Sequence, residues 1–142
     1  MRKPVIFLWA IIATLTAGII YVWPYLVMEL TDSAHYTESN KREYAFFTPD
    51  VLKAMPRISP RFDFLFVNIS GPAKHIHVIK FYNAEDISLI SKYLEQAGYR
   101  RQEKCEPQPS LCWRNADPQE TIYVGSLRGE KTVIVQVVYD FT

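Results

Sequence analysis

The hydrophobic pattern of the chain begins with one long apolar segment. From Pro4 to Met28 no charged side chain occurs. A helix rises 1.5 Å per residue, so this run exceeds the roughly 20 residues that the hydrocarbon core of a bilayer requires. A cleavable secretion signal has a shorter apolar region of about 7 to 15 residues that ends at small residues. Here the apolar run continues past the small residues at 16–18. The pattern predicts a cytoplasmic tip and transmembrane anchor in residues 1–28, with a processed signal as the alternative.

Beyond the anchor the pattern changes twice. Residues 29–43 are polar and follow neither the helical nor the strand period, which predicts an irregular linker. Residues 44–142 contain several runs in which apolar residues recur regularly. About 100 residues are enough for one hydrophobic core and too few for two. The sequence therefore predicts a single folded domain after the linker.

Four runs in this domain are predicted to be β-strands. The last alternates with a period of two, whereas the first has apolar residues on both of its faces, which predicts a strand covered on both faces. The four runs are rich in β-branched and aromatic residues, as strands usually are. They cover residues 61–69, 74–82, 121–127 and 131–141. Short breaks containing glycine separate the members of the first pair and of the last pair, which favours two hairpins.

A helix is predicted between these two hairpins. Asn83 is a suitable N-cap, and Gly98 can adopt the left-handed conformation that commonly ends a helix. Between them apolar residues recur at helical spacing, at Ile87, Ile90, Leu94 and Ala97. A second, shorter helix is expected to begin at Thr48 and Pro49. Hairpins with one main helix predict an α+β fold, in which the helix packs on an antiparallel sheet.

The distribution of charged residues predicts the membrane topology and argues against nucleic acid as a partner. Arg2 and Lys3 precede the apolar segment, and basic residues are enriched on the cytoplasmic side of membrane proteins. We therefore expect a single-pass protein of the inner membrane, with its N-terminus in the cytoplasm and its C-terminal domain in the periplasm. The remaining fourteen basic and all fifteen acidic residues follow the segment. A nearly neutral domain carries no field suited to nucleic acid.

Small residues form a stripe within the predicted anchor. Ala10, Thr14 and Gly18 are spaced four apart and share one helix face. Small side chains allow two helices to approach closely, which would permit a homodimer through the transmembrane helix. The alternative is that small residues are simply common in membrane spans.

The two cysteines, Cys105 and Cys112, flank a proline-containing segment at 106–110. Thiols tend to pair in an oxidising compartment such as the periplasm. The topology therefore predicts a disulfide, which would stabilise the domain by roughly 2 to 3 kcal/mol. Unpaired thiols in a reducing compartment are the alternative.

Residues near the cysteines are candidates for binding a partner. Trp113 directly follows Cys112, and a fixed loop that displays an indole is suited to protein recognition. Arg100, Arg101 and Arg114 form a basic patch beside it. The alternatives are that Trp113 belongs to the core and that the arginines lie on a solvated strand face.

The sequence contains little that indicates catalysis. His75 and His77 are two apart on a strand and leave the same face, which makes them weak candidates for metal ligands because no third ligand stands nearby at a typical spacing. No nucleophile elbow and no glycine-rich phosphate loop is found, and we expect no cofactor. The resulting hypothesis is a non-enzymatic, membrane-anchored module that binds another envelope protein, such as an immunity-type inhibitor or an accessory subunit of an envelope assembly. The alternatives are a small envelope hydrolase and a lipid- or glycan-binding module.

Overall fold

The computed structural model describes residues 2–105, 111–127 and 129–142. The chain divides into two compact units, one that ends at Thr31 and one from Asp32 to Thr142, and each is described by itself. The first unit is a single helix, α1 (Arg2–Glu29). This helix is long and apolar enough to cross a membrane, a property that it shares with secretion signals near an N-terminus.

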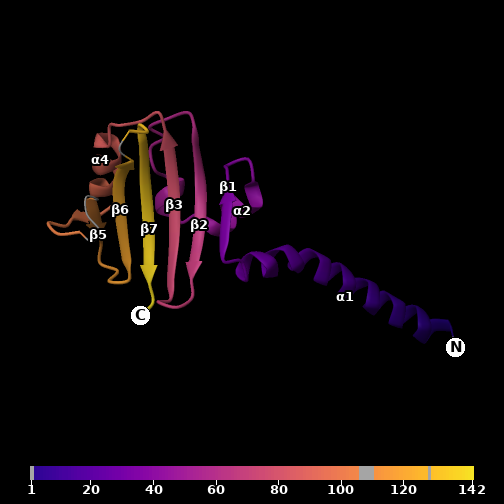
Figure 1. Cartoon of the computed structure of the whole chain (residues 1–142). Coiled ribbons are helices and arrows are strands. Elements are labelled where there is room, and N and C mark those ends of the chain that lie inside the picture. The colour runs from indigo at the N-terminus through magenta and orange to yellow at the C-terminus, as the bar shows by residue number, and fades with distance from the viewer. Residues whose placement is uncertain (1, 106–110, 128) are drawn as a thin grey trace. The chain divides into compact units, whose positions relative to one another are not determined.

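The second unit is built on one sheet in which every neighbouring pair of strands is antiparallel. In spatial order the strands are β1 (Ser33–Tyr36), β2 (Phe62–Ile69), β3 (Lys74–Tyr82), β7 (Thr132–Asp140), β6 (Glu120–Leu127), β5 (Leu111–Arg114) and β4 (Arg100–Arg101) (Figure 1). The described part of the unit also contains the helices α2 (Lys41–Phe47), α3 (Asp50–Lys53) and α4 (Ser88–Gln96). The predicted α+β fold, with an apolar N-terminal helix and an antiparallel sheet, is confirmed.

One face of the sheet, which we call the core face, carries the hydrophobic core. Alternate residues of the four central strands are buried there, among them Phe64, Phe66, Ile79, Phe81, Ile122, Val124, Val133, Val135 and Val137. Helix α2 packs on this face, because the ring of Phe47 stacks on Phe66 at 4.7 Å and Tyr44 meets Phe64 edge-on at 5.3 Å. In α4, Ile90 and Leu94 are fully buried. The hydrophobic effect thus fixes which side of each strand turns inward.

The opposite side of the sheet, which we call the open face, is also rich in apolar residues. The register places on it Leu65, Val67, Ile76, Val78, Ile134 and Val138 from the three strands β2, β3 and β7. Leu65 is 37% exposed, and all the others except Val78 are partly exposed, so the expectation that residues 61–69 are covered on both faces is wrong. Salt bridges lie at the two ends of this face, between His35 and Asp63 and between Lys74 and Asp140.

The structure differs from the expected linker at residues 29–43. This stretch contains β1 and the first residues of α2. Strand β1 pairs with the edge of β2, and the ring of Tyr36 stacks on Phe64 at 5.4 Å. The Tyr36 hydroxyl also lies 2.7 Å from the hydroxyl of Thr48. These contacts join residues far apart in sequence, and a short polar segment gives no sign of them.

The predicted starts of both helices also differ from the structure. Helix α4 begins at Ser88, after the predicted start, and Asn83 has a positive φ of 55° where an N-cap is usually extended, so it caps no helix. The carboxylate of Asp86 accepts a hydrogen bond from the Ser88 amide at 2.9 Å. Thr48 caps no helix with its side chain, since its hydroxyl is engaged by Tyr36. Gly98 does end α4 in the left-handed region, as predicted, with φ of 94°. The predicted irregular segment at 106–110 lies outside the described residues.

Candidate partner-binding site

The candidate site is built on the two short strands at one edge of the sheet. Strand β4 pairs with β5, which sets Arg100 opposite Arg114 and Arg101 opposite Trp113. The amide of Gln102 continues the ladder by donating a hydrogen bond to the carbonyl of Cys112 at 2.9 Å. The sulfur atoms of Cys105 and Cys112 lie at bonding distance, and both residues are buried. We call residues 100–105 and 111–114 the stapled hairpin.

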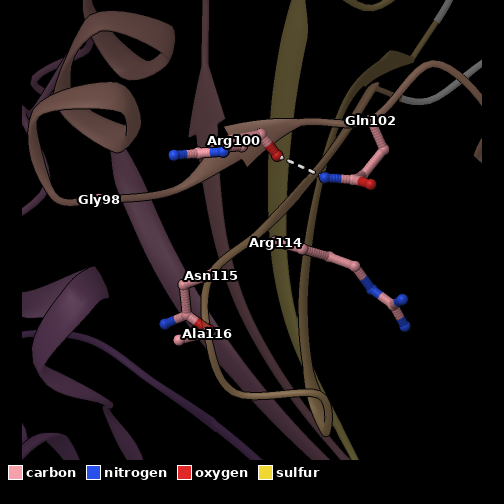
Figure 2. Close-up of a pocket in the computed structure, with 6 residues that line it drawn as sticks. All are labelled: Gly98, Arg100, Gln102, Arg114, Asn115 and Ala116. Atoms are coloured by element: carbon pink, nitrogen blue, oxygen red, sulfur yellow. Dashed lines mark hydrogen bonds between the residues drawn. The ribbon is translucent and has the colours of Figure 1, made fainter.

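Two neighbouring hollows lie on this hairpin. The first has a volume of about 490 Å³ and is lined by Gly98, Arg100, Gln102, Arg114, Asn115 and Ala116 (Figure 2). The second has a volume of about 340 Å³ and is lined by Gln102, Lys104, Cys105, Cys112, Arg114, Thr121 and Tyr123. Because Gln102 and Arg114 line both, the two hollows adjoin. We call them together the basic hollows.

The Arg114 side chain is held in place at the junction of the two hollows. Its Nε donates a hydrogen bond to the hydroxyl of Thr121 at 3.1 Å. The terminal nitrogens of a guanidinium held in this way can still bind a carboxylate with two hydrogen bonds. In Figure 2 the side chain of Arg114 extends to the same side as the amide of Gln102, while that of Arg100 extends in the other direction.

The basic side chains of the hairpin have no carboxylate partner in the described part of the chain. The ion pairs found there join Arg57 to Glu38, Lys74 to Asp140 and His35 to Asp63. Arg100, Lys104 and Arg114 are all exposed. Residues 100–114 contain four basic and two acidic side chains, so this segment of the sequence has a formal charge of +2 in a domain that is nearly neutral. The arrangement is suited to binding an anionic group.

The structure brings together only part of the predicted partner-binding set. Arg100 and Arg114 line the first hollow, as a contact surface requires. Arg101 is exposed but lines neither hollow. Trp113 is 1% exposed and lies in the core, which agrees with the alternative that it is a core residue and not with a displayed indole. Its indole Nε1 has no hydrogen-bond partner among the described residues.

His75 and His77, the two histidines of β3, lie on the core face near the edge of the core. The Nδ1 of His77 is 2.5 Å from the carbonyl oxygen of Phe47, and the ring is partly covered by α2. Burial lowers the pKa of His77 to about 4, so the ring is neutral at pH 7 and Nδ1 carries the donated hydrogen. Within the described residues no cluster of three metal-ligating side chains includes His75 or His77.

Sequence reasoning missed a polar row on the core face. Cross-strand pairing places Asn68, His75, Tyr139 and Glu120 side by side across four adjacent strands. Glu120 is 8% exposed and accepts a hydrogen bond from the Tyr99 phenol. Burial, together with the Glu120 carboxylate, raises the pKa of both Tyr99 and Tyr139. The alternation of Ile122 and Val124 extends to position 120, and this signal could have revealed that Glu120 points inward.

The small-residue stripe lies on α1. The hydroxyl of Thr14 donates a hydrogen bond to the carbonyl of Ala10 at 2.9 Å, and a side chain added at Gly18 would meet nothing within 4 Å. The stripe is thus open along its length, and the homodimer stays a prediction.

Comparison with known proteins provides no relative for this chain. No protein family, no curated protein and no solved structure matched it.

Proposed function

We propose that the chain is a membrane-anchored periplasmic module that binds another envelope protein. In this proposal α1 remains in the inner membrane as a single-pass anchor with its N-terminus in the cytoplasm. The partner would be an incoming toxin that the module inhibits, or a complex to which the module belongs as an accessory subunit. Tethering keeps a small domain near the membrane and so raises its concentration next to a partner that works there.

The observation that carries the proposal is the open face. Helices α2 and α4 bury their apolar residues with the core face, whereas Leu65, Val67 and Ile76 remain partly exposed on the other side. Neighbouring apolar side chains that stay partly exposed on a monomer can mark an interaction site, and those of the open face adjoin across β2, β3 and β7. Antiparallel sheets commonly turn one face to water, but that face is then usually polar.

The disulfide supports the proposed compartment. Cys105 and Cys112 are the only cysteines of the chain, and they lie at bonding distance. Disulfides persist in oxidising compartments and are rare in the cytosol. This reasoning, together with the basic residues that precede α1, supports a periplasmic location.

Site-specific photo-crosslinking of the full-length protein in intact cells tests the proposal. A photoreactive residue at Ile76 of the open face should give one discrete protein adduct, in a yield comparable to the amount of the module. The same residue at Glu95, an exposed position of α4, is the matched control and should give none. Absence of a discrete adduct from Ile76 in cells that express the module normally would refute the proposal.

A separate measurement tests the topology. Protease added to spheroplasts should degrade the domain while the inner membrane is intact, and the protein should keep its full length when the membrane fraction is purified. Recovery of a shortened, soluble product would show instead that α1 is a processed signal.

A further inference from the structure

The open face and the basic hollows form one continuous surface. One cross-strand row runs from Val67 through Ile76 and Val138 to Thr121. Thr121 accepts the hydrogen bond from Arg114 and lines the second hollow. The apolar part of the surface on β2, β3 and β7 therefore leads directly to cationic side chains on β4 and β5.

We infer that this surface binds an extended protein segment in which acidic residues stand next to apolar ones. The apolar residues of that segment cover Val67, Ile76 and Val138, and its carboxylates enter the basic hollows to pair with Arg114 and Arg100. The inference rests on the proposed function and adds the chemistry of the partner.

The directions of the two arginines define the segment more closely. Because Arg100 and Arg114 extend to different sides in Figure 2, one carboxylate does not fit both. Arg114, fixed by Thr121, is prepared to bind a carboxylate through its terminal nitrogens. The occupant therefore needs at least two acidic side chains, one for each end of the first hollow.

A protein segment fits this surface better than a membrane does. Anionic lipid headgroups attract flexible basic residues that project from a surface. Here the Arg114 guanidinium is restrained by its hydrogen bond to Thr121 and lines two hollows, which can accept individual side chains.

A second copy of the chain is a poorer occupant. It would have to offer acidic groups, and the carboxylates on the open face are engaged. Asp63 pairs with His35 and accepts a hydrogen bond from Tyr82, while Asp140 pairs with Lys74. Charge complementarity therefore favours a different protein.

The test uses p-benzoylphenylalanine in the full-length protein in intact cells, placed at Gln102, which lines both hollows, and at Ala116, which lines the first. We expect one protein adduct, and mass spectrometry should locate it within a segment containing at least two Asp or Glu residues beside apolar ones. When the photoreactive residue is at Ala116, the additional change Arg114→Glu should lower the yield of the crosslinked adduct about tenfold or more. Changing the contacted acidic residues of the partner to Lys should restore it.

Lys92→Glu on α4 is the matched control, because it makes the same change of charge at an exposed position outside the surface. It should leave the yield unchanged. Arg114→Gln, which removes the charge without reversing it, should give an intermediate yield. An unchanged thermal unfolding temperature and an intact disulfide in both Arg114 variants would show that they fold.

The outcomes separate the inference from the proposed function. An adduct at Ile76 with none at Gln102 and Ala116, or a contacted segment without acidic residues, overturns the inference and leaves the proposed function standing. Adducts with phospholipid alone would identify a membrane-binding surface and overturn the inference. Absence of protein adducts at all three positions overturns both.

Discussion

The phenol of Tyr99 donates a hydrogen bond to the carboxylate of Glu120, and this bond closes the base of the stapled hairpin. Tyr99 follows the end of α4, and Glu120 is the first residue of β6. The chain between them contains β4, the disulfide and β5. The bond therefore links the helix on the core face to the strands that carry the basic hollows.

Removing this donor should destabilise the domain. We expect Tyr99→Phe to lower the free energy of unfolding by about 1–3 kcal/mol, because it deprives a buried carboxylate of a hydrogen bond. Thermal unfolding followed by near-UV circular dichroism measures the effect. Tyr123→Phe is the matched control, since Tyr123 is a half-exposed tyrosine of the adjoining open face. Equal effects of the two changes would contradict the proposed importance of the Tyr99 bond.

Acid should destabilise the fold through His77. Burial lowers its pKa in the folded state to about 4, whereas the unfolded residue titrates near its usual value of 6.5. Above pH 6.5 both states are neutral and the full stability is present. Between pH 6.5 and 4 the unfolded state binds a proton that the folded state does not, so stability falls, by at most about 3 kcal/mol.

Unfolding midpoints measured from pH 7.5 to 4 test this reasoning. His77→Gln, which retains a side-chain donor for the Phe47 carbonyl, should flatten the dependence on pH in this range. His75→Gln, two residues away on the same strand face, should keep most of it. A slope that survives in His77→Gln would assign the acid sensitivity to other groups.

The strands were predicted well wherever alternation is long. Strand β3 matches the predicted residues 74–82, and β7 lies within the predicted 131–141. A period of two over eight or nine residues specifies the strand, and its inward face follows because one residue of slippage would move the buried side chains of the core face to the open face. Strand β1 has only four residues and depends on pairing with β2, so no local sequence pattern predicts it.

The candidate site could be predicted only in part, because some of its features are local and others depend on how the strands pair. The disulfide and the exposure of Arg100 and Arg114 agree with the prediction, since nearby cysteines and solvated arginines are local properties. The orientation of Trp113 depends on which face of a four-residue strand turns inward, and the pairing of Trp113 with Ile122 decides this. Adjacency to a cysteine does not decide this orientation, and the alternative that Trp113 belongs to the core agrees with the structure.

Loss of the disulfide should lower the stability of the whole fold. The double variant Cys105→Ser, Cys112→Ser should lose roughly 2 to 3 kcal/mol, because the bond closes a short loop and restricts mainly the unfolded chain. Chemical unfolding of the full-length protein with and without reductant measures this loss. Reductant should bring the wild type to the stability of the double variant and leave the double variant unchanged. A wild type insensitive to reductant would mean that the thiols are not joined.

Substitutions of Trp113 distinguish a core residue from a contact residue. Trp113→Phe should cost only about 1–2 kcal/mol, because the smaller ring leaves a cavity but also removes an indole N–H that has no partner among the described residues. Trp113→Ala should cost about 3–5 kcal/mol, as is usual when a large buried aromatic side chain is truncated. Both are measured by thermal unfolding, alongside the yield of the photo-crosslinked adduct at Ala116. If Trp113→Ala left the stability unchanged and abolished the adduct, the indole would be a contact residue after all, and the assignment of Trp113 to the core would fail.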